Sequence, residues 1–194
     1  MLTIERDDGL LVHQAIVFAA KAHREQLRKG TDIPYIIHPF EVAQILTDAG
    51  AEAALIIAGL LHDVLEDTPV AAEAIGREFG QEVCRLVQSA SEDKSQSWEA
   101  RKERTVAFLR EEASLDERLL ACADKLSNLR SFQADQQALG EVVWTRFKRG
   151  RESQRWYYGA LVEALAPLAG YAMYQELLER FQAVFGPAKK PDSL

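Results

Sequence analysis

The spacing of apolar residues is helical along nearly the whole chain of 194 residues. Near the N-terminus, Leu11, Ala15, Phe18 and Ala22 recur at intervals of three or four residues. One face of an α-helix requires this interval. No segment of useful length alternates apolar and polar residues as a half-buried strand does. The sequence therefore predicts an all-α fold, a compact helical bundle.

Glycine, proline and polar stretches divide this pattern into separate helices. A first helix is expected to end near residue 23, followed by a loop over 26–37. A buried helix over 51–67 ends at Thr68-Pro69, because the residue before a proline disfavours the helical conformation. Another helix is expected to begin at Pro39. Further helices are expected over 71–79, 81–88, 98–109, 115–129, 141–165 and 167–185, with a polar loop over 89–97.

The length and composition fit one globular domain. Hydrophobic residues make up 47% and charged residues 27% of the chain, which is ordinary for a soluble protein. We expect a single domain over residues 1–194, with a core from about 10 to 185 and a frayed tail over 186–194.

Charge and hydropathy restrict the partners. The formal net charge of −7 argues against a generic surface for nucleic acid, although it leaves room for a local basic pocket. The N-terminus carries acidic residues where a signal peptide would be basic, and the longest apolar run, 53–61, is too short to span a bilayer. Cys84 and Cys122 lie among apolar helical residues and are expected to be buried. We predict a cytoplasmic protein with no nucleic-acid or membrane partner, and leave a homo-oligomer open.

Ionisable residues that could bind a metal or catalyse a reaction are concentrated at the end of the buried helix, where His62-Asp63 is followed by Glu66-Asp67. Four ionisable side chains within six positions are costly to bury without partners, and a divalent cation would offset that cost. On a continuous helix, His62 and Asp63 can both lean toward one ion. Glu66 and Asp67 lie one turn further, at roughly 6 Å of axial rise, where a group that handles a water proton could stand.

Two further residues are candidate ligands from other segments. His38 follows a loop and stands at the entrance of a helix, from which it could reach a neighbour. Asp124 interrupts an apolar helix face. Taken alone, Asp124 is more simply explained as an exposed carboxylate paired with Lys125 or Arg130.

The order His38, His62-Asp63, Asp124 resembles the pattern of the HD superfamily of metal-dependent phosphohydrolases. The flanking segments narrow the likeness to the hydrolase domain of the RelA/SpoT alarmone enzymes, which typically reads RK…PYIxHP…HDxxEDT…FG…ADRLHNxR. This chain has RK at 28–29, PYIIHP at 34–39, HDVLEDT at 62–68, FG at 79–80 and ADKLSNLR at 123–130.

The likeness runs from about residue 10 to 165 and leaves no room for a synthetase domain. The chain is similar to stand-alone small alarmone hydrolases such as the metazoan SpoT homologue. Lys125 stands where the family usually has Arg, and Ser127 where it usually has His before Asn128. Neither position is a presumed metal ligand.

The resemblance implies hydrolysis of guanosine 3′,5′-bis(diphosphate) and its pentaphosphate relative (ppGpp and pppGpp) to GDP or GTP and pyrophosphate. It also implies a role for each matching residue. His38, His62, Asp63 and Asp124 would bind one divalent metal, Mn²⁺ by family habit; Glu66 and Asp67 would position or deprotonate the attacking water; Arg28, Lys29, Tyr35 and Asn128 would contact the guanine nucleotide.

Two other functions stay open at this point. The chain could be an HD nucleotidase or phosphodiesterase for another nucleotide, including an NADPH phosphatase. It could instead be a sensor that binds the alarmone without hydrolysing it. Glu66 and Asp67 argue against a sensor, which has no need of them.

Several remaining residues have a structural and a functional interpretation. We expect His13 and His23 to be structural, with His23 bracing the following loop. The aromatic run 156–158 is expected to form core and pocket wall. The basic run of Arg146, Lys148, Arg149, Arg151 and Arg155 is either a solvated helix face or a phosphate cradle, and Lys94, Arg101, Lys102 and Arg104 are expected at the surface.

Overall fold

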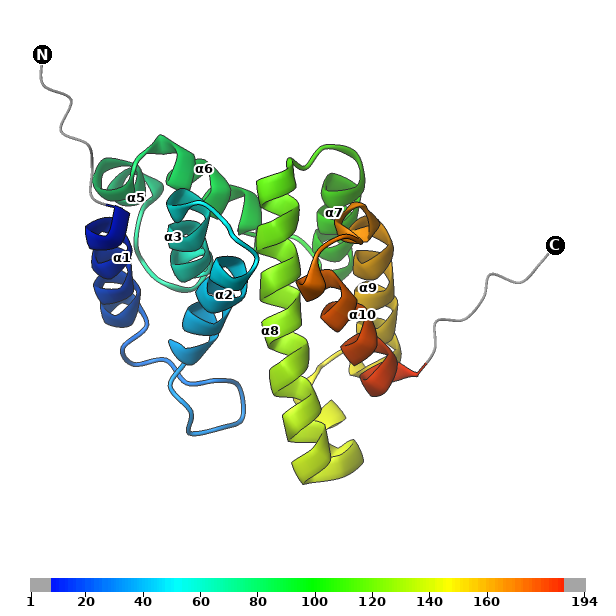
Figure 1. Ribbon diagram of the computed structural model, residues 1–194. Coiled ribbons are helices and arrows are strands. Elements are labelled where there is room, and N and C mark those ends of the chain that lie inside the picture. Colours follow the sequence, from blue (N-terminus) through cyan, green and yellow to red (C-terminus); the bar gives the residue numbers. More distant parts are fainter. Residues whose placement is uncertain (1–7, 187–194) are drawn as a thin grey trace, which may run out of the picture.

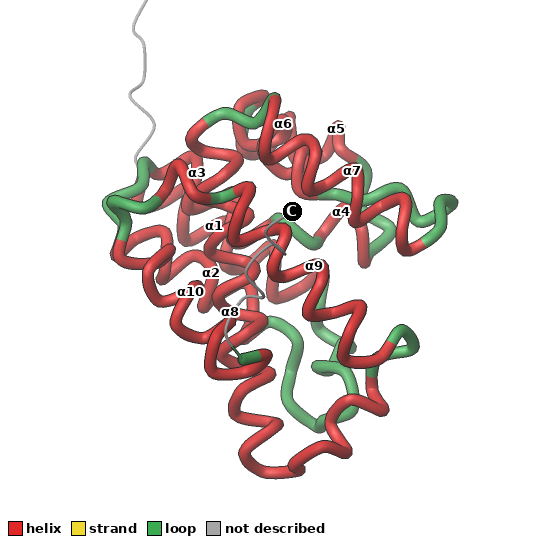
Figure 2. Tube along the Cα trace, turned by 90° about the vertical axis from the view of Figure 1, so that its right-hand side faces the viewer, coloured by secondary structure: helices red, strands yellow, loops and turns green. Residues whose placement is uncertain are grey.

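The computed structural model describes residues 8–186, and every regular element in that range is a helix (Figures 1 and 2). This confirms the all-α prediction. None of these helices is long and apolar enough to cross a membrane. Of the expected tail over 186–194, all but Gly186 lies outside the described residues. The α-helices are α1 (Asp8–Ala22), α2 (Ile37–Asp48), α3 (Ala53–Leu61), α4 (Val64–Asp67), α5 (Ala72–Phe79), α6 (Gln81–Ala90), α7 (Trp98–Glu111), α8 (Leu115–Leu139), α9 (Gly150–Ala164) and α10 (Ala172–Phe185), with 3₁₀ helices η1 (Gly140–Arg146) and η2 (Ala166–Leu168).

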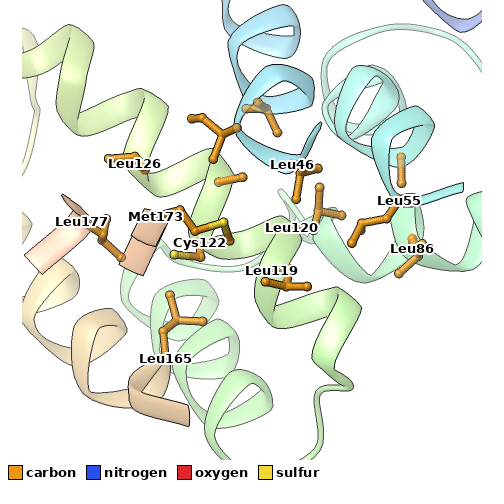
Figure 3. Close-up of a cluster of buried hydrophobic side chains, with 14 of the residues drawn as sticks. Leu46, Leu55, Leu86, Leu119, Leu120, Cys122, Leu126, Leu165, Met173 and Leu177 are labelled. Carbon is orange, nitrogen blue, oxygen red and sulfur yellow. The ribbon is translucent and has the colours of Figure 1, made fainter. Parts of the chain in front are cut away.

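The long helix α8 is the centre of the fold. It packs against α2, α3 and α6 on one side and against α10 on the other, so it divides the helices into two groups (Figure 1). Buried side chains fill both contacts. Figure 3 shows Leu46, Leu55 and Leu86 gathered near Leu120 of α8, while Cys122 lies among the side chains that face α10. Both cysteines are buried and free, as the sequence predicts.

Local sequence signals begin helices α7 and α8. The first backbone N–H groups of a helix have no partner within it, so a side chain must accept them. Ser97 Oγ accepts from Ala100 N at 3.1 Å. Ser114 and Glu117 form a reciprocal capping box, in which Ser114 N donates to Glu117 Oε2 at 2.7 Å and Glu117 N donates to Ser114 Oγ at 3.3 Å.

The prediction of one continuous helix over 51–67 is wrong. It is divided at His62-Asp63 into α3 and α4. In an uninterrupted helix the Gly59 carbonyl would accept from the Asp63 backbone. Here His62 Nδ1 lies 2.8 Å from that carbonyl oxygen, and helical bonding resumes only with Asp67 N donating to Asp63 O. The break therefore lies at the residues that carry the chemistry.

The helices predicted over 141–165 and 167–185 each begin later than expected. Residues 140–146 form η1, and α9 begins only at Gly150, whose φ of 69° lies in the region that favours glycine. Residues 166–168 form η2, and α10 begins at Ala172.

Helices α2 and α3 pack against each other across a glycine of α3. A Cβ at Gly59 would lie 2.7 Å from Leu46 Cδ1 and 3.3 Å from Val42 Cγ1. These distances leave no space for a side chain, so Gly59 permits the approach. The close packing brings His38, at the start of α2, beside His62, at the end of α3, with ring centroids 5.0 Å apart.

Candidate functional site

The four residues predicted to bind a metal come together where α2, α3 and α8 meet. His38 Nε2 lies 3.2 Å from Asp124 Oδ1 and 3.5 Å from Asp63 Oδ2. His62 Nε2 lies 3.0 Å from Asp63 Oδ2 and 3.8 Å from Asp124 Oδ1. One ligand atom each from His38, His62 and Asp124 falls within 4.8 Å of the others, and Asp63 contacts both imidazoles. Helices α2 and α8 and the break between α3 and α4 thus direct four polar groups at one point.

This cluster is almost removed from solvent. His38 and His62 are 3% and 2% exposed, and the carboxylates of Asp63 and Asp124 are also largely buried. His62 Nε2 is buried and makes no hydrogen bond of good geometry among the described residues, although Asp63 Oδ2 lies 3.0 Å away. A buried polar atom without a partner is costly. A cation bound by both imidazoles and both carboxylates would satisfy this atom, so the residues present fit a divalent metal.

In the cluster, burial and the neighbouring charges shift the pKa values of the ionisable groups in opposite directions. Burial lowers the pKa of the His38 imidazole. Burial also opposes a charge on His62, but the adjacent Asp63 and Asp124 carboxylates raise the pKa of His62 to about 9. Burial opposes ionisation of the two carboxyls as well, yet His62 lowers the pKa of Asp63, and Lys125 with the two histidines lowers that of Asp124. The imidazoles and the carboxylates thus favour one another's charged forms against the effect of burial.

Each candidate ligand also has a hydrogen bond to a group outside the cluster. Tyr35 donates its hydroxyl to Asp63 Oδ2. Asp124 accepts from Lys125 Nζ and from Asn128 Nδ2, both at 2.6 Å. The two histidines are held through Nδ1, which leaves Nε2 of each ring facing the carboxylates. Such outer contacts fix the orientation of metal ligands.

Glu66 and Asp67 lie in α4, the short helix that follows His62-Asp63. Lys94, from the loop between α6 and α7, donates to Asp67 Oδ1 at 2.6 Å and to the Glu66 backbone oxygen at 2.9 Å. The backbone N–H of Glu92 donates to Glu66 Oε2 at 3.2 Å. Burial raises the pKa of Glu66 above its ordinary value. The loop over 91–97 is therefore attached to the predicted catalytic pair, a contact that the sequence did not indicate.

All four residues predicted to contact substrate line one cavity of about 360 Å³, between the loop before α2 and helices α7, α8 and α9. Lys102, Lys125 and Arg146 add three more cations, whereas Asp135, itself bound to Arg146 at 2.6 Å, is the single carboxylate of the lining among the described residues. Aromatic rings form most of the remaining wall. The lining consists of Arg28, Lys29, Thr31, Tyr35, Trp98, Lys102, Lys125, Asn128, Leu129, Ser131, Phe132, Asp135, Val143, Trp144, Arg146, Phe147, Gln154, Tyr157, Tyr158 and Phe185.

Lys102 was expected at the surface, and that prediction is wrong. Its side chain is only 16% exposed, donates to Glu92 Oε1 at 2.7 Å and lies 4.8 Å from the centroid of the Tyr157 ring. The signal was present in the sequence, because Lys102 lies four residues after Trp98 and so shares its inward helix face. Its charge had suggested solvent instead.

The basic run 146–155 does not act as one surface. Arg146 lines the cavity and approaches the loop, with Nη2 at 3.2 Å from the Gly30 carbonyl oxygen. Arg149 pairs with Glu99 at 3.0 Å, and Arg151 lies 5.4 Å from the centroid of the Trp144 ring. Only part of the phosphate-cradle interpretation therefore has a geometric basis, at Arg146.

The aromatic and histidine predictions mostly agree with the structure. Tyr157 and Tyr158 line the cavity, while Trp156 is 46% exposed. His23 is buried, and its Nδ1 lies 2.7 Å from Gln26 Oε1, so it braces the loop as expected. His13 is exposed on α1, away from the cluster.

A second cavity of about 730 Å³ reaches the same cluster from the side of α6 and α7. His62, Asp124 and Lys125 line its inner end. Its other charges are mixed, since Arg101 and Arg104 face a wall that also includes Glu92 and Asp93. The second cavity thus includes two candidate ligands, whereas the first includes none and meets the cluster through Tyr35, Lys125 and Asn128, which bind Asp63 and Asp124. Only the first cavity has a clear excess of cations over carboxylates.

Comparison with known proteins assigns the chain to a family. The family model described as HD domain matches residues 15–149. The guanosine-3′,5′-bis(diphosphate) 3′-pyrophosphohydrolase MESH1 of Xenopus tropicalis is 38% identical over 129 residues, which cover 65% of this chain and 72% of that protein. The GTP pyrophosphokinase rsh of Brucella melitensis is 34% identical over 188 residues, which cover 94% of this chain but only 23% of that longer protein.

Two solved structures share the fold. The crystal structure of lmo0812 from Listeria monocytogenes has a TM-score of 0.73 at 37% identity and covers 77% of this chain and 99% of its own. A metazoan orthologue of SpoT, described as hydrolysing ppGpp, has a TM-score of 0.78 at 29% identity and covers 91% and 97%. Sequence, fold and the clustered His and Asp residues agree, and the chain therefore belongs to the HD-domain family.

Proposed function

We propose that this protein hydrolyses ppGpp and pppGpp at the 3′ position, releasing pyrophosphate and leaving GDP or GTP. The proposal rests on the contact between the cation-rich cavity and the candidate metal cluster. The cavity of about 360 Å³ contains cations and aromatic rings suited to a nucleotide polyanion. Asn128, in its wall, donates to Asp124 of the candidate metal cluster at 2.6 Å. Relatives named for this activity support the same substrate.

HD phosphohydrolases depend on a metal, and we assign the metal to His38, His62, Asp63 and Asp124. Two imidazoles and two carboxylates suit Mn²⁺, which accepts both nitrogen and oxygen ligands. A bound divalent cation would make a water molecule more acidic and stabilise negative charge on phosphoryl oxygens. The protein contributes the fixed orientation of the four side chains, through Tyr35 and the other outer contacts.

The cavity provides the contacts that hold the nucleotide. Arg28 and Lys29 lie on the loop before α2, and Arg146 approaches the same loop, so a phosphate between them would meet cations from two segments. The planar Arg28 guanidinium could also stack on the guanine ring. Asn128 already bonds to Arg28 and Asp124, and its second N–H and second lone pair are left for base or ribose. Such contacts position the 3′ diphosphate beside the cluster.

We assign to Glu66 and Asp67 the role of accepting the proton of the attacking water. Burial raises the pKa of Glu66, which moves this carboxylate toward the range where a general base works best near neutral pH. The water oxygen bonds to the phosphorus that carries the ribose 3′ oxygen, and its proton passes to the carboxylate. The bond from phosphorus to the 3′ oxygen then breaks, and that oxygen takes up a proton as pyrophosphate separates.

The test is product analysis with Mn²⁺ and purified ppGpp. Anion-exchange chromatography should show GDP and pyrophosphate in equal amounts. Orthophosphate as the sole initial product would indicate a nucleotidase. In a parallel assay, orthophosphate from NADPH together with intact ppGpp would indicate an NADPH phosphatase. Binding of ppGpp without any product would indicate a sensor. Each of these three results would replace the proposed reaction.

Other expectations also remain proposals. We expect one domain, a cytoplasmic location and no nucleic-acid partner, because the formal net charge is −7 and the cations gather in one cavity. Whether the protein forms a homo-oligomer is decided by light scattering coupled to gel filtration.

A further inference from the structure

Ser127 lies directly behind the candidate metal ligand His38. Its side chain is 1% exposed, and its Oγ lies 2.8 Å from His38 Nδ1. The same hydroxyl donates to Glu41 Oε2 at 2.7 Å. His38 and Glu41 belong to α2, whereas Ser127 belongs to α8. The hydroxyl thus connects the imidazole to a carboxylate through a contact between two helices.

Glu41 is held in place on its other side. Arg130 Nη1 donates to Glu41 Oε1 at 3.0 Å, while Arg130 Nε and Nη2 donate to the two oxygens of Glu176, at 2.8 and 2.6 Å. Arg130 therefore anchors Glu41 to α10. Both oxygens of the Glu41 carboxylate thus act as acceptors, Oε1 from Arg130 and Oε2 from Ser127.

The direction of these hydrogen bonds follows from the number of protons. Ser127 has one hydroxyl proton, and Glu41 takes it. The hydroxyl can then only accept from His38, so the proton of a neutral His38 must be on Nδ1. The lone pair of His38 is consequently on Nε2, the atom that lies near Asp63 and Asp124.

We infer that Glu41 and Ser127 are positioning residues that fix the tautomer and orientation of His38 so that Nε2 is presented to the metal. The inference rests on the metal site assigned under the proposed function. Ser127 departs from the His that is usual in the RelA/SpoT hydrolase domain. In this chain, a buried serine and a glutamate of α2 together provide the outer contact of His38.

Metal binding tests the inference without substrate. Electron paramagnetic resonance of free Mn²⁺ gives the Kd of the full-length protein and its variants. Ser127→Ala and Glu41→Gln should each raise that Kd by about 10- to 100-fold, the usual effect of removing an outer partner of a metal ligand. Ser127→Thr keeps the hydroxyl, and this variant should bind Mn²⁺ more tightly than Ser127→Ala does.

Two matched controls separate positioning from general loss of stability. Cys122→Ala removes one buried atom from the same helix, at a side chain that lies in the apolar core (Figure 3). Glu179→Gln makes the same exchange of a carboxylate for an amide at an exposed position of α10, outside the contacts of Arg130. Both controls should bind Mn²⁺ as the unaltered protein does.

The tautomer of His38 supplies a second readout. In metal-free protein labelled with ¹⁵N in its imidazoles, long-range ¹H–¹⁵N spectra should show a proton on Nδ1 of His38. Glu41→Gln should shift that proton toward Nε2, because a glutamine amide can donate to Ser127 and free its hydroxyl to donate to His38.

The outcomes are distinct. If the unaltered protein binds Mn²⁺ tightly while both variants match it and keep the tautomer, the inference is wrong and the metal site stands. A proton on Nε2 of His38 in the unaltered protein also overturns the inference. If the unaltered protein binds no Mn²⁺, the metal assignment fails and the inference fails with it.

Discussion

Arg28 and Asn128 are separated by 100 positions in the sequence, yet the Arg28 guanidinium donates to Asn128 Oδ1 at 3.1 Å. The amide nitrogen of the same Asn128 donates to Asp124. This pair of contacts connects the loop before α2, the nucleotide cavity and the metal cluster. A change on the loop can thus affect substrate binding while the metal ligands keep their own supports.

The first prediction concerns Arg28. Arg28→Ala should raise KM for ppGpp by roughly 10- to 150-fold, because a hydrogen bond to a charged group contributes about 1.5–3 kcal/mol. Metal content should not change, since Arg28 contacts none of the candidate ligands directly. Initial rates and elemental analysis measure the two effects. Arg24→Ala removes an exposed arginine from the same segment and serves as control. An Arg28→Ala protein that loses its metal contradicts this division.

The second prediction concerns the metal ligands. His62→Ala or Asp63→Ala should weaken Mn²⁺ binding by more than about 100-fold, because outer partners alone contribute about 10–100-fold. Hydrolysis should be lost with the metal. Elemental analysis after dialysis provides the measurement. His13→Ala, at an exposed histidine of α1, should retain both properties. Stoichiometric metal and full turnover in His62→Ala would refute the site.

The third prediction separates metal binding from proton transfer. Glu66→Gln or Asp67→Asn should lower kcat by about 10²–10⁴-fold with little change in KM, because a general base acts mainly in the transition state. Both variants should keep their metal. Asp48→Asn, at the exposed end of α2, is the matched control. If both carboxylate variants lose the metal instead, Glu66 and Asp67 are ligands.

The fourth prediction concerns the dependence of stability on pH. Hydrogen bonds from Arg130 and Arg180 lower the pKa of Glu176 below its ordinary value of 4.5. A carboxyl with a lowered pKa stabilises the fold above its ordinary pKa, and this stabilisation is lost as pH falls through the lowered value. Glu176→Gln should therefore reduce the free energy of unfolding at neutral pH, by on the order of 1 kcal/mol or less for a partly exposed pair.

Urea denaturation from neutral pH down to about pH 3 measures this effect. The difference between Glu176→Gln and the unaltered protein should shrink as the pH falls. A difference that is independent of pH would show that the ion pair with Arg130 does not contribute.

The sequence alone determined the helical class and the identity of the residues in the cluster. Local rules sufficed for the class, because apolar residues repeat at helical intervals and Ser97 and Ser114 begin helices through contacts three residues away. The motif around His62-Asp63 indicated a metal because ionisable groups in an apolar segment need a partner. His38 and Asp124 joined this motif through the resemblance to the HD pattern, because Asp124 alone is more simply explained as an exposed carboxylate.

Only the tertiary structure decided how the site is held. The helix over 51–67 is divided where the His62 side chain lies 2.8 Å from the Gly59 carbonyl oxygen, a contact that helical periodicity cannot reveal. Ser127 and His38 are 89 positions apart, and Lys94 and Asp67 are 27 apart. Such contacts depend on which faces of α2, α4 and α8 come together, and that is fixed by the packing of the whole core.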